Sequence, residues 1–161
     1  MDSTEISFRT KIQLSDVENL VNLARSTGYF NDEEVMIVQE LVQETLDQPK
    51  SGYCWIIAEN ERIPVGFTCY GSIAGSLNTW DLYWIVVAQN LRGGGIGKKL
   101  IRQTEHDVKA NNGALLIAET SGRQQYQDTH SFYQRCGYTL EATIKDFYAP
   151  LDDKLFYVKR M

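Results

Sequence analysis

The stretch that decides how this chain is interpreted reads Val87-Ala88-Gln89-Asn90-Leu91-Arg92-Gly93-Gly94-Gly95-Ile96-Gly97-Lys98-Lys99-Leu100. It joins an apolar run, expected to be a buried strand, to an amphipathic segment expected to be a helix. Glycines at such a junction let the backbone approach a ligand closely, and a helix N-terminus offers free N–H groups. Arg92, Lys98, Lys99 and Arg102 add four cations. The segment therefore predicts a binding site for a polyanion such as a pyrophosphate.

Two familiar phosphate-binding loops do not fit this segment. A Walker A loop needs glycine and then Ser or Thr at two positions that are held here by Arg92 and Lys99. The dinucleotide fingerprint requires a glycine where this chain has Lys98 or Leu100. The pattern that fits is Arg/Gln-x-x-Gly-x-Gly/Ala, which Arg92–Gly97 matches at every fixed position.

The composition is that of a globular protein that carries net negative charge. The chain has 161 residues, of which 43% are hydrophobic and 23% charged, and no linker or repeat divides it, so we expect a single domain over residues 1–161. Its 16 basic and 21 acidic residues give a net charge of −5. A nucleic-acid partner is therefore not expected, because phosphate contacts need a basic face.

Cysteine, histidine and hydropathy patterns narrow the class further. Cys54, Cys69 and Cys136 are scattered and odd in number, which favours a reducing compartment over a disulfide framework. The two histidines form no zinc-binding spacing, so we expect no metal. The segment Met1–Thr10 lacks the apolar core of a signal peptide, and the longest apolar run, Leu82–Ala88, is far shorter than the roughly 20 residues of a membrane span. We expect a soluble, cytoplasmic protein with no membrane partner.

Hydrophobic periodicity predicts the order β-α-α-β-β-β-α-β-α-β-β. A capping box at Ser15 and Glu18 begins the first helix, which Gly28 ends, and Asn31 with Glu34 begins the second. The expected strands are residues 6–8, 53–58, 63–70, 82–87, 114–118, 138–144 and 155–158, and the later helices are residues 96–112 and a short one through 132–136. The strands at residues 82–87 and 114–118 are expected to be buried, and residues 147–153 to form a loop.

At the glycine loop the chain resembles the GNAT superfamily of acyl-CoA-dependent N-acyltransferases, and the element order resembles that fold over nearly the whole chain. The resemblance implies an α/β (α+β) fold with a mixed, largely antiparallel sheet of six to seven strands and about four helices. It implies that coenzyme A, supplied as acetyl-CoA, binds here. The implied contacts are backbone groups of Ile85, Val86 and Val87 for the pantetheine arm, in a cleft beside the next strand, and Arg92, Gly93, Gly94, Gly95, Ile96, Gly97 and Lys98 for the pyrophosphate.

A second signature of the family is a short helix that ends in Phe-Tyr-x-x-x-Gly-Phe/Tyr. This chain has Phe132-Tyr133-Gln134-Arg135-Cys136-Gly137-Tyr138, so the resemblance implies that Tyr133 is the general acid for a departing thiolate. The alternative is a packed core tyrosine. Most relatives have Asn seven residues before this tyrosine, whereas this chain has Tyr126, which is a further candidate cofactor contact.

Two carboxylates are candidate bases for the amine, which must be neutral to attack a thioester. Asp81 lies at the expected start of a strand, eleven residues before Arg92, where the histone acetyltransferase branch has its catalytic glutamate. Glu119, at the expected end of the next strand, resembles a glutamate of ribosomal-protein N-acetyltransferases with a two-residue offset. Each has the alternative of being a solvated carboxylate at a strand end, and the choice between them stays open.

The expected function is transfer of an acetyl group from acetyl-CoA to a primary amine of a small molecule, amino acid or peptide by direct attack. Two alternatives remain: a protein lysine or N-terminal acetyltransferase, and a non-catalytic acyl-CoA sensor. The three cysteines are expected to be core residues rather than nucleophiles. The first two helices and the late hairpin are expected to select the amine, whose identity is open, and a homodimer is left open as an assembly. Eight aromatic residues are candidates to line the acceptor site, none of them assigned: Tyr29, Phe30, Trp55, Tyr70, Trp80, Trp84, Phe147 and Tyr148.

Overall fold

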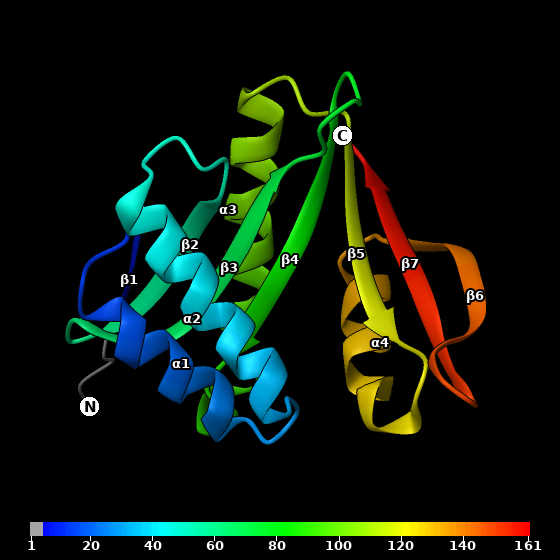
Figure 1. Ribbon diagram of the computed structural model, residues 1–161, viewed down its shortest axis with the longest axis horizontal. Coiled ribbons are helices and arrows are strands. Elements are labelled where there is room, and N and C mark those ends of the chain that lie inside the picture. The colour runs from blue at the N-terminus through cyan, green and yellow to red at the C-terminus, as the bar shows by residue number, and fades with distance from the viewer. Residues whose placement is uncertain (1–4) are drawn as a thin grey trace. The chain divides into compact units, whose positions relative to one another are not determined.

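The computed structural model describes residues 5–161, which form seven strands and four α-helices (Figure 1). Residues 1–4 lie outside the described range. They begin the segment Met1–Thr10, in which no signal peptide is expected. The order β-α-α-β-β-β-α-β-α-β-β is confirmed. The elements are β1 (Ile6–Arg9), α1 (Asp16–Ser26), α2 (Asp32–Asp47), β2 (Cys54–Asn60), β3 (Ile63–Ser72), β4 (Thr79–Val87), α3 (Ile96–Ala110), β5 (Leu115–Ser121), α4 (Gln127–Arg135), β6 (Thr139–Ala149) and β7 (Asp152–Arg160), with short 3-10 turns η1 (Gln89–Leu91) and η2 (Gln124–Tyr126).

The strands form a mixed sheet in the order β1-β2-β3-β4-β5-β7-β6. The pairs β1–β2, β2–β3, β5–β7 and β6–β7 are antiparallel, whereas β4 and β5 run parallel. This confirms the expected fold class. The chain divides into two compact units, one made of the residues up to Gly71 with Trp84–Thr104, the other of Ser72–Tyr83 with Glu105–Met161. The expectation of a single domain over residues 1–161 stays a prediction.

In the first unit, α1 and α2 cover one face of the strands β2–β4 and α3 lies on the other face (Figure 1). An apolar core holds α1 and α2 against the sheet, and each fully buried aliphatic or aromatic side chain contributes about 1.5–3 kcal/mol. Its buried members are Ile12, Leu20, Leu23, Ala24, Val38, Val42, Trp55, Ile57, Phe67, Cys69 and Val86. On the opposite face Gly66 lets α3 approach, because a Cβ there would lie 3.0 Å from Leu100 Cδ1. The start of α3 is therefore fixed closely against β3.

The two early helices begin differently from each other. Asn31 and Glu34 form the expected capping box of α2. The capping box predicted at Ser15 is wrong, because Ser15 has helical dihedral angles and makes no side-chain cap. The buried Asp16 takes its place: its carboxylate accepts the Gln13 N–H at 2.7 Å and pairs with Arg9 at 2.7 Å. The carboxylate thus ties the turn before α1 to Arg9 of β1 by charge-assisted hydrogen bonds rather than capping the N–H groups of the helix.

In the second unit, α4 packs on one face of β5 and β7 (Figure 1). Its C-terminal end is tied down by Lys159, which donates to the Cys136 carbonyl at 2.8 Å and to Glu105 at 2.9 Å. The Tyr138 hydroxyl donates to the same Glu105 carboxylate at 3.0 Å. These bonds fix the helix that carries Tyr133.

Several strands are longer than the sequence pattern predicted. β4 begins at Thr79 rather than 82, and β5 continues to Ser121 rather than 118. The expected loop at residues 147–153 is instead the end of β6, a turn at Pro150 and Leu151, and the start of β7. The expectation that β4 and β5 are buried on both faces is also wrong, because burial alternates in β5 and Tyr83 of β4 is 41% exposed.

Strand β6 is the last in the sheet order, and all eleven of its residues are exposed. Its pairing with β7 shifts between Leu140 and Ala142 and again between Ile144 and Ala149. Asp146, within the second irregularity, has φ +54°. Such bulges bend an edge strand away from a flat form.

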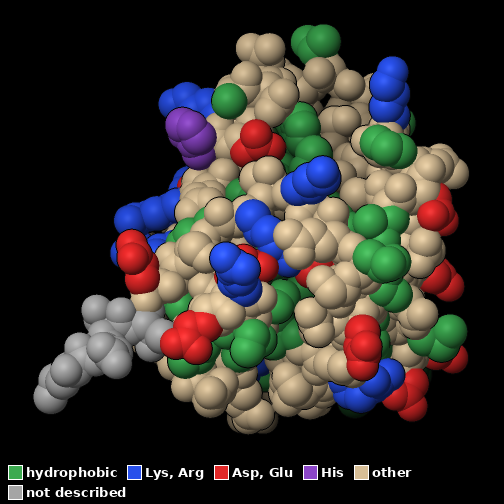
Figure 2. Space-filling view, turned by 90° about the vertical axis from the view of Figure 1, so that its left-hand side faces the viewer, with side chains coloured by type: hydrophobic (Ala, Val, Ile, Leu, Met, Phe, Trp, Pro, Cys, Tyr) green, Lys and Arg blue, Asp and Glu red, His purple; other side chains and the backbone are tan. Residues whose placement is uncertain are grey.

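Charges of both signs share the face of the molecule shown in Figure 2, where basic side chains alternate with acidic ones across the middle of the view. A nucleic-acid interface would need clustered basic side chains. This face therefore has the mixed charge of an ordinary solvated surface.

Candidate functional site

The glycine loop is built as predicted, at the end of β4 in the first unit. Gly93 and Gly95 have φ of +80° and +85°, which only glycine adopts without strain, and both are exposed. The Lys99 N–H donates to the Gly95 carbonyl at 3.1 Å, which is the first bond of α3. The N–H groups of Ile96, Gly97 and Lys98 therefore precede the helical bonds and point out of the helix N-terminus. This is an anion-binding geometry made from backbone.

Cations surround this helix start, and no acidic residue lies in its first turn. Lys98, Lys99 and Arg102 are exposed. The Arg92 guanidinium lies over the Tyr29 ring, 4.4 Å from its centroid. A stacked guanidinium keeps its N–H donors in the ring-parallel plane, where an anion can reach them. Tyr29, in the connection between α1 and α2, thus orients the predicted phosphate-binding arginine.

The other predicted cofactor contacts differ in how far they are buried. Val86 is buried in the core, and Ile85 and Val87 are partly buried, so any ligand contact of this strand would be made by its backbone. Tyr126 lies in η2 with only 9% of its surface exposed, and the Arg123 guanidinium is 5.9 Å from its ring centroid. The roles of these four residues stay predictions, as does the expected cleft between β4 and β5.

Tyr133 lies on α4 in the second unit, with 4% of its surface exposed. Its ring is 5.5 Å from that of Tyr157 and 5.6 Å from that of Tyr138, measured between centroids. Burial, with a smaller effect of Cys136, raises the pKa of the Tyr133 phenol well above its usual range. The hydroxyl is therefore protonated at neutral pH, as a proton donor must be.

Asp81 and Glu119 come together with a lysine that the sequence did not single out. The Lys154 ammonium lies 2.7 Å from Glu119 Oε2. Burial and, to a smaller extent, the negative charge of Glu119 raise the pKa of Asp81, whereas Lys154 lowers it, and the net result is a pKa of about 6. A carboxylate with a pKa near neutrality is suited to general base catalysis. The expectation that Asp81 and Glu119 stand at strand ends is wrong, since both lie inside longer strands.

The register places the candidate acid and the candidate bases on opposite faces of the sheet. Asp81 pairs with Ile117 on β5, so its side chain shares a face with Glu119, two residues further on. Tyr157, which contacts Tyr133, pairs with Ala118 and so faces the other way. The second unit can therefore offer a base from one face and an acid from the other.

The eight aromatic candidates for an acceptor site separate into three groups by exposure. Trp55 and Tyr70 are 2% and 1% exposed and belong to the core. Phe147 and Tyr148 on β6 are each 49% exposed, with their rings in an edge-to-face contact at 4.9 Å. The other four, Tyr29, Phe30, Trp80 and Trp84, are partly buried, so Phe147 and Tyr148 offer the most surface to a ligand.

The three cysteines differ in burial, since Cys69 is buried whereas Cys54 and Cys136 are half-buried. Cys54, Cys69 and Cys136 form no disulfide bond, and burial raises the pKa of the Cys69 thiol, which keeps it protonated. Within residues 5–161, no group of three or more His, Cys, Asp or Glu side chains is placed to hold a metal ion. In the same range, no helix is both long and apolar enough to cross a membrane.

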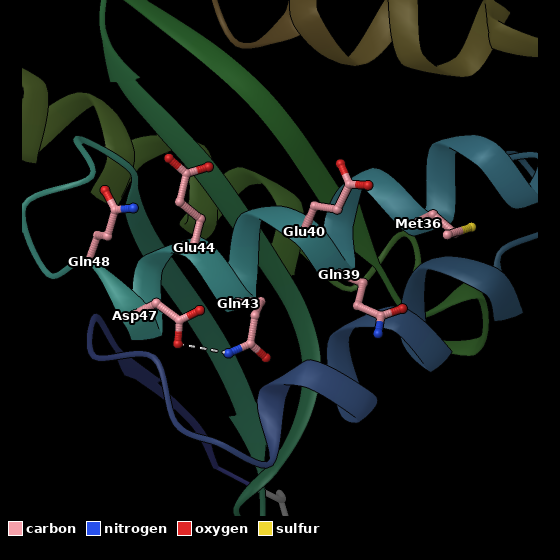
Figure 3. Close-up of a pocket in the computed structure, with 7 residues that line it drawn as sticks. All are labelled: Met36, Gln39, Glu40, Gln43, Glu44, Asp47 and Gln48. Carbon is pink, nitrogen blue, oxygen red and sulfur yellow. Dashed lines mark hydrogen bonds between the residues drawn. The ribbon is translucent and has the colours of Figure 1, made fainter.

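A surface depression of about 430 Å³ runs along α2, and it contains none of the predicted site residues. Figure 3 shows Glu40 and Glu44 on one side of the helix and Gln39, Gln43 and Asp47 on the other. The Gln43 amide donates to Asp47 at 3.0 Å. Because α2 and the residue that follows it supply the whole lining, this is a polar helix surface rather than an enclosed site.

Comparison with known proteins gives a consistent result. Residues 50–140 match the model of the acetyltransferase (GNAT) domain. A structure from Desulfovibrio desulfuricans, described as an acetyltransferase of the GNAT family, is 38% identical with a TM-score of 0.95, covering 97% of this chain and 99% of the other. The structure of PaiA N-acetyltransferase from Thermoplasma acidophilum in complex with coenzyme A is 20% identical with a TM-score of 0.75, over 98% and 99% of the two chains.

One curated relative is the 5-NmdU N-acetyltransferase of Pseudomonas phage PaMx11. It is 36% identical over 87 residues, which are 53% of this chain and 58% of the relative. The match thus spans little more than half the length of that relative.

Proposed function

The chain belongs to the GNAT acetyltransferase family, and we propose that it transfers an acetyl group from acetyl-CoA to a primary amine of a small molecule, amino acid or peptide. The observation that carries this proposal is the glycine loop. Gly93 and Gly95 adopt positive φ angles that open the N-terminus of α3 beside Arg92 and Lys98. That arrangement of backbone donors and cations suits the pyrophosphate of coenzyme A.

The residues present fit this group. A Cβ at Gly93 or Gly95 would meet no atom within 4 Å, so the loop borders open space where a phosphate can approach the backbone. The N–H groups of Ile96, Gly97 and Lys98 would donate to phosphate oxygens, and Arg92 would add a charged donor. Bound acetyl-CoA supplies the acetyl thioester. Tyr126 and the backbone of Ile85–Val87 are the further proposed contacts.

The second unit provides the acid–base groups. An acceptor ammonium must lose a proton before its nitrogen can attack, and a carboxylate at Asp81 or Glu119 would accept that proton. The buried hydroxyl of Tyr133 would donate a proton to the departing sulfur. Overall, the acceptor ammonium and the thioester give an amide, a thiol and one free proton. A cytoplasmic location is a part of the proposal that rests on the sequence alone, and a homodimer is left open as an assembly.

The test is a thiol-release assay with acetyl-CoA and a panel of primary amines, with melting temperatures measured beside it. We expect acetyl-CoA and CoA to raise the melting temperature and at least one amine to release thiol. If neither acetyl-CoA nor CoA raises the melting temperature, the cofactor assignment is refuted. Stabilisation without thiol release for any amine would instead favour the non-catalytic sensor.

A further inference from the structure

Three charged side chains of the second unit share one sheet face, and the lysine among them has no part in the function proposed so far. Glu119 on β5 pairs with Phe156 on β7, and Ser121 pairs with Lys154. Side chains alternate along a strand, so Lys154 and Phe156 point to the same side as Glu119 and Asp81. These residues, with Phe147 of β6, are called the Lys154 cluster.

The ammonium of Lys154 is enclosed rather than solvated. It lies 2.7 Å from Glu119 Oε2 and 4.3 Å and 5.3 Å from the ring centroids of Phe147 and Phe156. Only 15% of the Lys154 side chain is exposed, against 83% for Lys145 on the same hairpin. A lysine on a surface hairpin ordinarily extends into water, so this one is held by its carboxylate and its two rings.

The two carboxylates of the cluster are not equivalent. Glu119 forms a short ion pair with Lys154, so its negative charge is balanced within the protein. Among the described residues, the charged groups that act on Asp81 are Glu119 from β5 and Lys154 from β7, with opposite effects on its affinity for a proton. Asp81 is thus the carboxylate that remains for a substrate, while Glu119 and Lys154 adjust its ionisation.

We propose that Lys154 is a positioning residue: by holding Glu119 in an ion pair, it leaves Asp81 as the carboxylate that accepts the proton of the amine. The inference rests on the proposed N-acetyltransferase function and deepens it by choosing between the two candidate bases. Asp81 takes one proton from the acceptor ammonium and becomes a neutral carboxyl group, and the freed nitrogen lone pair forms the bond to the acetyl carbon. Lys154 stays protonated throughout.

The first experiment titrates the Asp81 carboxyl by ¹³C NMR in the full-length protein without ligand. We expect its midpoint near 6 in the wild type. Lys154→Met should raise the midpoint by roughly half a unit or more, and Glu119→Gln should lower it by a similar amount, because the first removes an attractive charge and the second a repulsive one. Lys145→Met, which removes an exposed lysine from the same hairpin, should leave it unchanged, and Lys154→Arg should preserve it.

An unchanged Asp81 midpoint in a folded Lys154→Met protein would overturn the proposal, because the lysine would then have only a structural role. If Lys154→Met fails to fold, Glu119→Gln is the deciding variant. An Asp81 midpoint that does not fall in Glu119→Gln would also overturn the proposal. The pH profile of kcat/KM, with an amine found by the thiol-release panel, gives the second readout. Its acidic limb should move with the NMR midpoint, and Asp81→Asn should lose far more activity than Glu119→Gln.

The reverse ranking of those two variants would assign the base to Glu119 and refute the proposal. A panel without any active amine would contradict the proposed function but would leave the NMR titration as the test of what Lys154 does to Asp81. The two failures are therefore distinguishable.

Discussion

The Arg92–Gly97 loop and the Lys154 cluster both present charge to a substrate, but they are built from different materials. The loop uses backbone N–H groups whose direction follows from two left-handed glycines and the first bond of α3. The cluster uses side chains from four strands, β4 to β7, whose meeting depends on register. Backbone N–H groups do not titrate, whereas carboxylate and ammonium side chains can change their protonation. The first is suited to holding a ligand and the second to moving protons.

From this difference between the loop and the cluster, we expect variants of the second unit to change turnover and its pH dependence. Variants of the loop should instead change the binding of acetyl-CoA. The largest effect is expected for Tyr133→Phe, which removes the proposed proton donor but keeps the ring packed against Tyr157. We expect kcat to fall roughly 100-fold or more, with an unchanged affinity for CoA. Tyr157→Phe, which removes a hydroxyl from the neighbouring buried ring, is the matched control. Full turnover in Tyr133→Phe, with chemistry limiting the rate, would show that the residue is only a core tyrosine.

The next effect concerns the loop. Arg92→Ala removes a charged donor from the proposed pyrophosphate site, and we expect the KM for acetyl-CoA to rise about tenfold or more while kcat changes little. Stabilisation by CoA in a melting experiment should shrink in parallel. Arg102→Ala, on the same helix but beyond its first turn, should have a smaller effect. A change in the pH profile without a change in KM would break the division between the two regions.

Asp81 gives a prediction on stability as well as on rate. Its pKa is raised in the folded state to about 6 from the ordinary value of 3.8, so the folded protein binds the proton more tightly than the unfolded one. Below 3.8 both states are protonated. Between 3.8 and about 6 stability falls as pH rises, and above 6 the cost of the charged, partly buried carboxylate is fully present.

Asp81→Asn should therefore raise the melting temperature at pH 7.5 and leave it nearly unchanged at pH 4, while it lowers activity. The measurement is thermal unfolding of both proteins at the two pH values. Equal shifts of the melting temperature at both pH values would mean that the effect does not come from the ionisation of Asp81.

The smallest effect is expected for Tyr29, whose ring lies under Arg92 of the loop. Tyr29→Ala removes the ring under Arg92 and should raise the KM for acetyl-CoA roughly two- to fivefold, the size of an exposed cation–π contact. Tyr29→Phe keeps the ring and should behave like the wild type. A loss in Tyr29→Phe as large as that in Tyr29→Ala would assign the effect to the hydroxyl rather than to stacking.

Sequence reasoning reached the loop and the two carboxylates of the cluster but not Lys154, for a physical reason. The glycines, the cations and the helix start of residues 92–98 are contiguous, so local rules suffice to place them. The contact of Glu119 with Lys154 joins residues far apart in the chain, and it exists only because β5 and β7 pair in one register. The pattern also ended β5 at Ala118, since it did not anticipate that Thr120 would be buried while Glu119 faces outward.

Helix starts show the same limit on a smaller scale. The cap at Asn31 was predicted correctly because its partner Glu34 lies three residues away. The cap at Ser15 was not, because the guanidinium that binds Asp16 comes from Arg9 on β1, and Arg9 is itself held by Glu59 on β2 at 2.6 Å. A tertiary ion pair replaced a local motif.

The irregular edge strand β6 has a practical consequence for handling this protein. A long, exposed strand that carries Leu140, Ile144 and Phe147 would ordinarily be a template on which other chains add and form aggregates. The two shifts in register and the left-handed Asp146 leave little flat backbone for such growth. A deletion that straightens this strand is therefore expected to reduce the yield of soluble protein during expression.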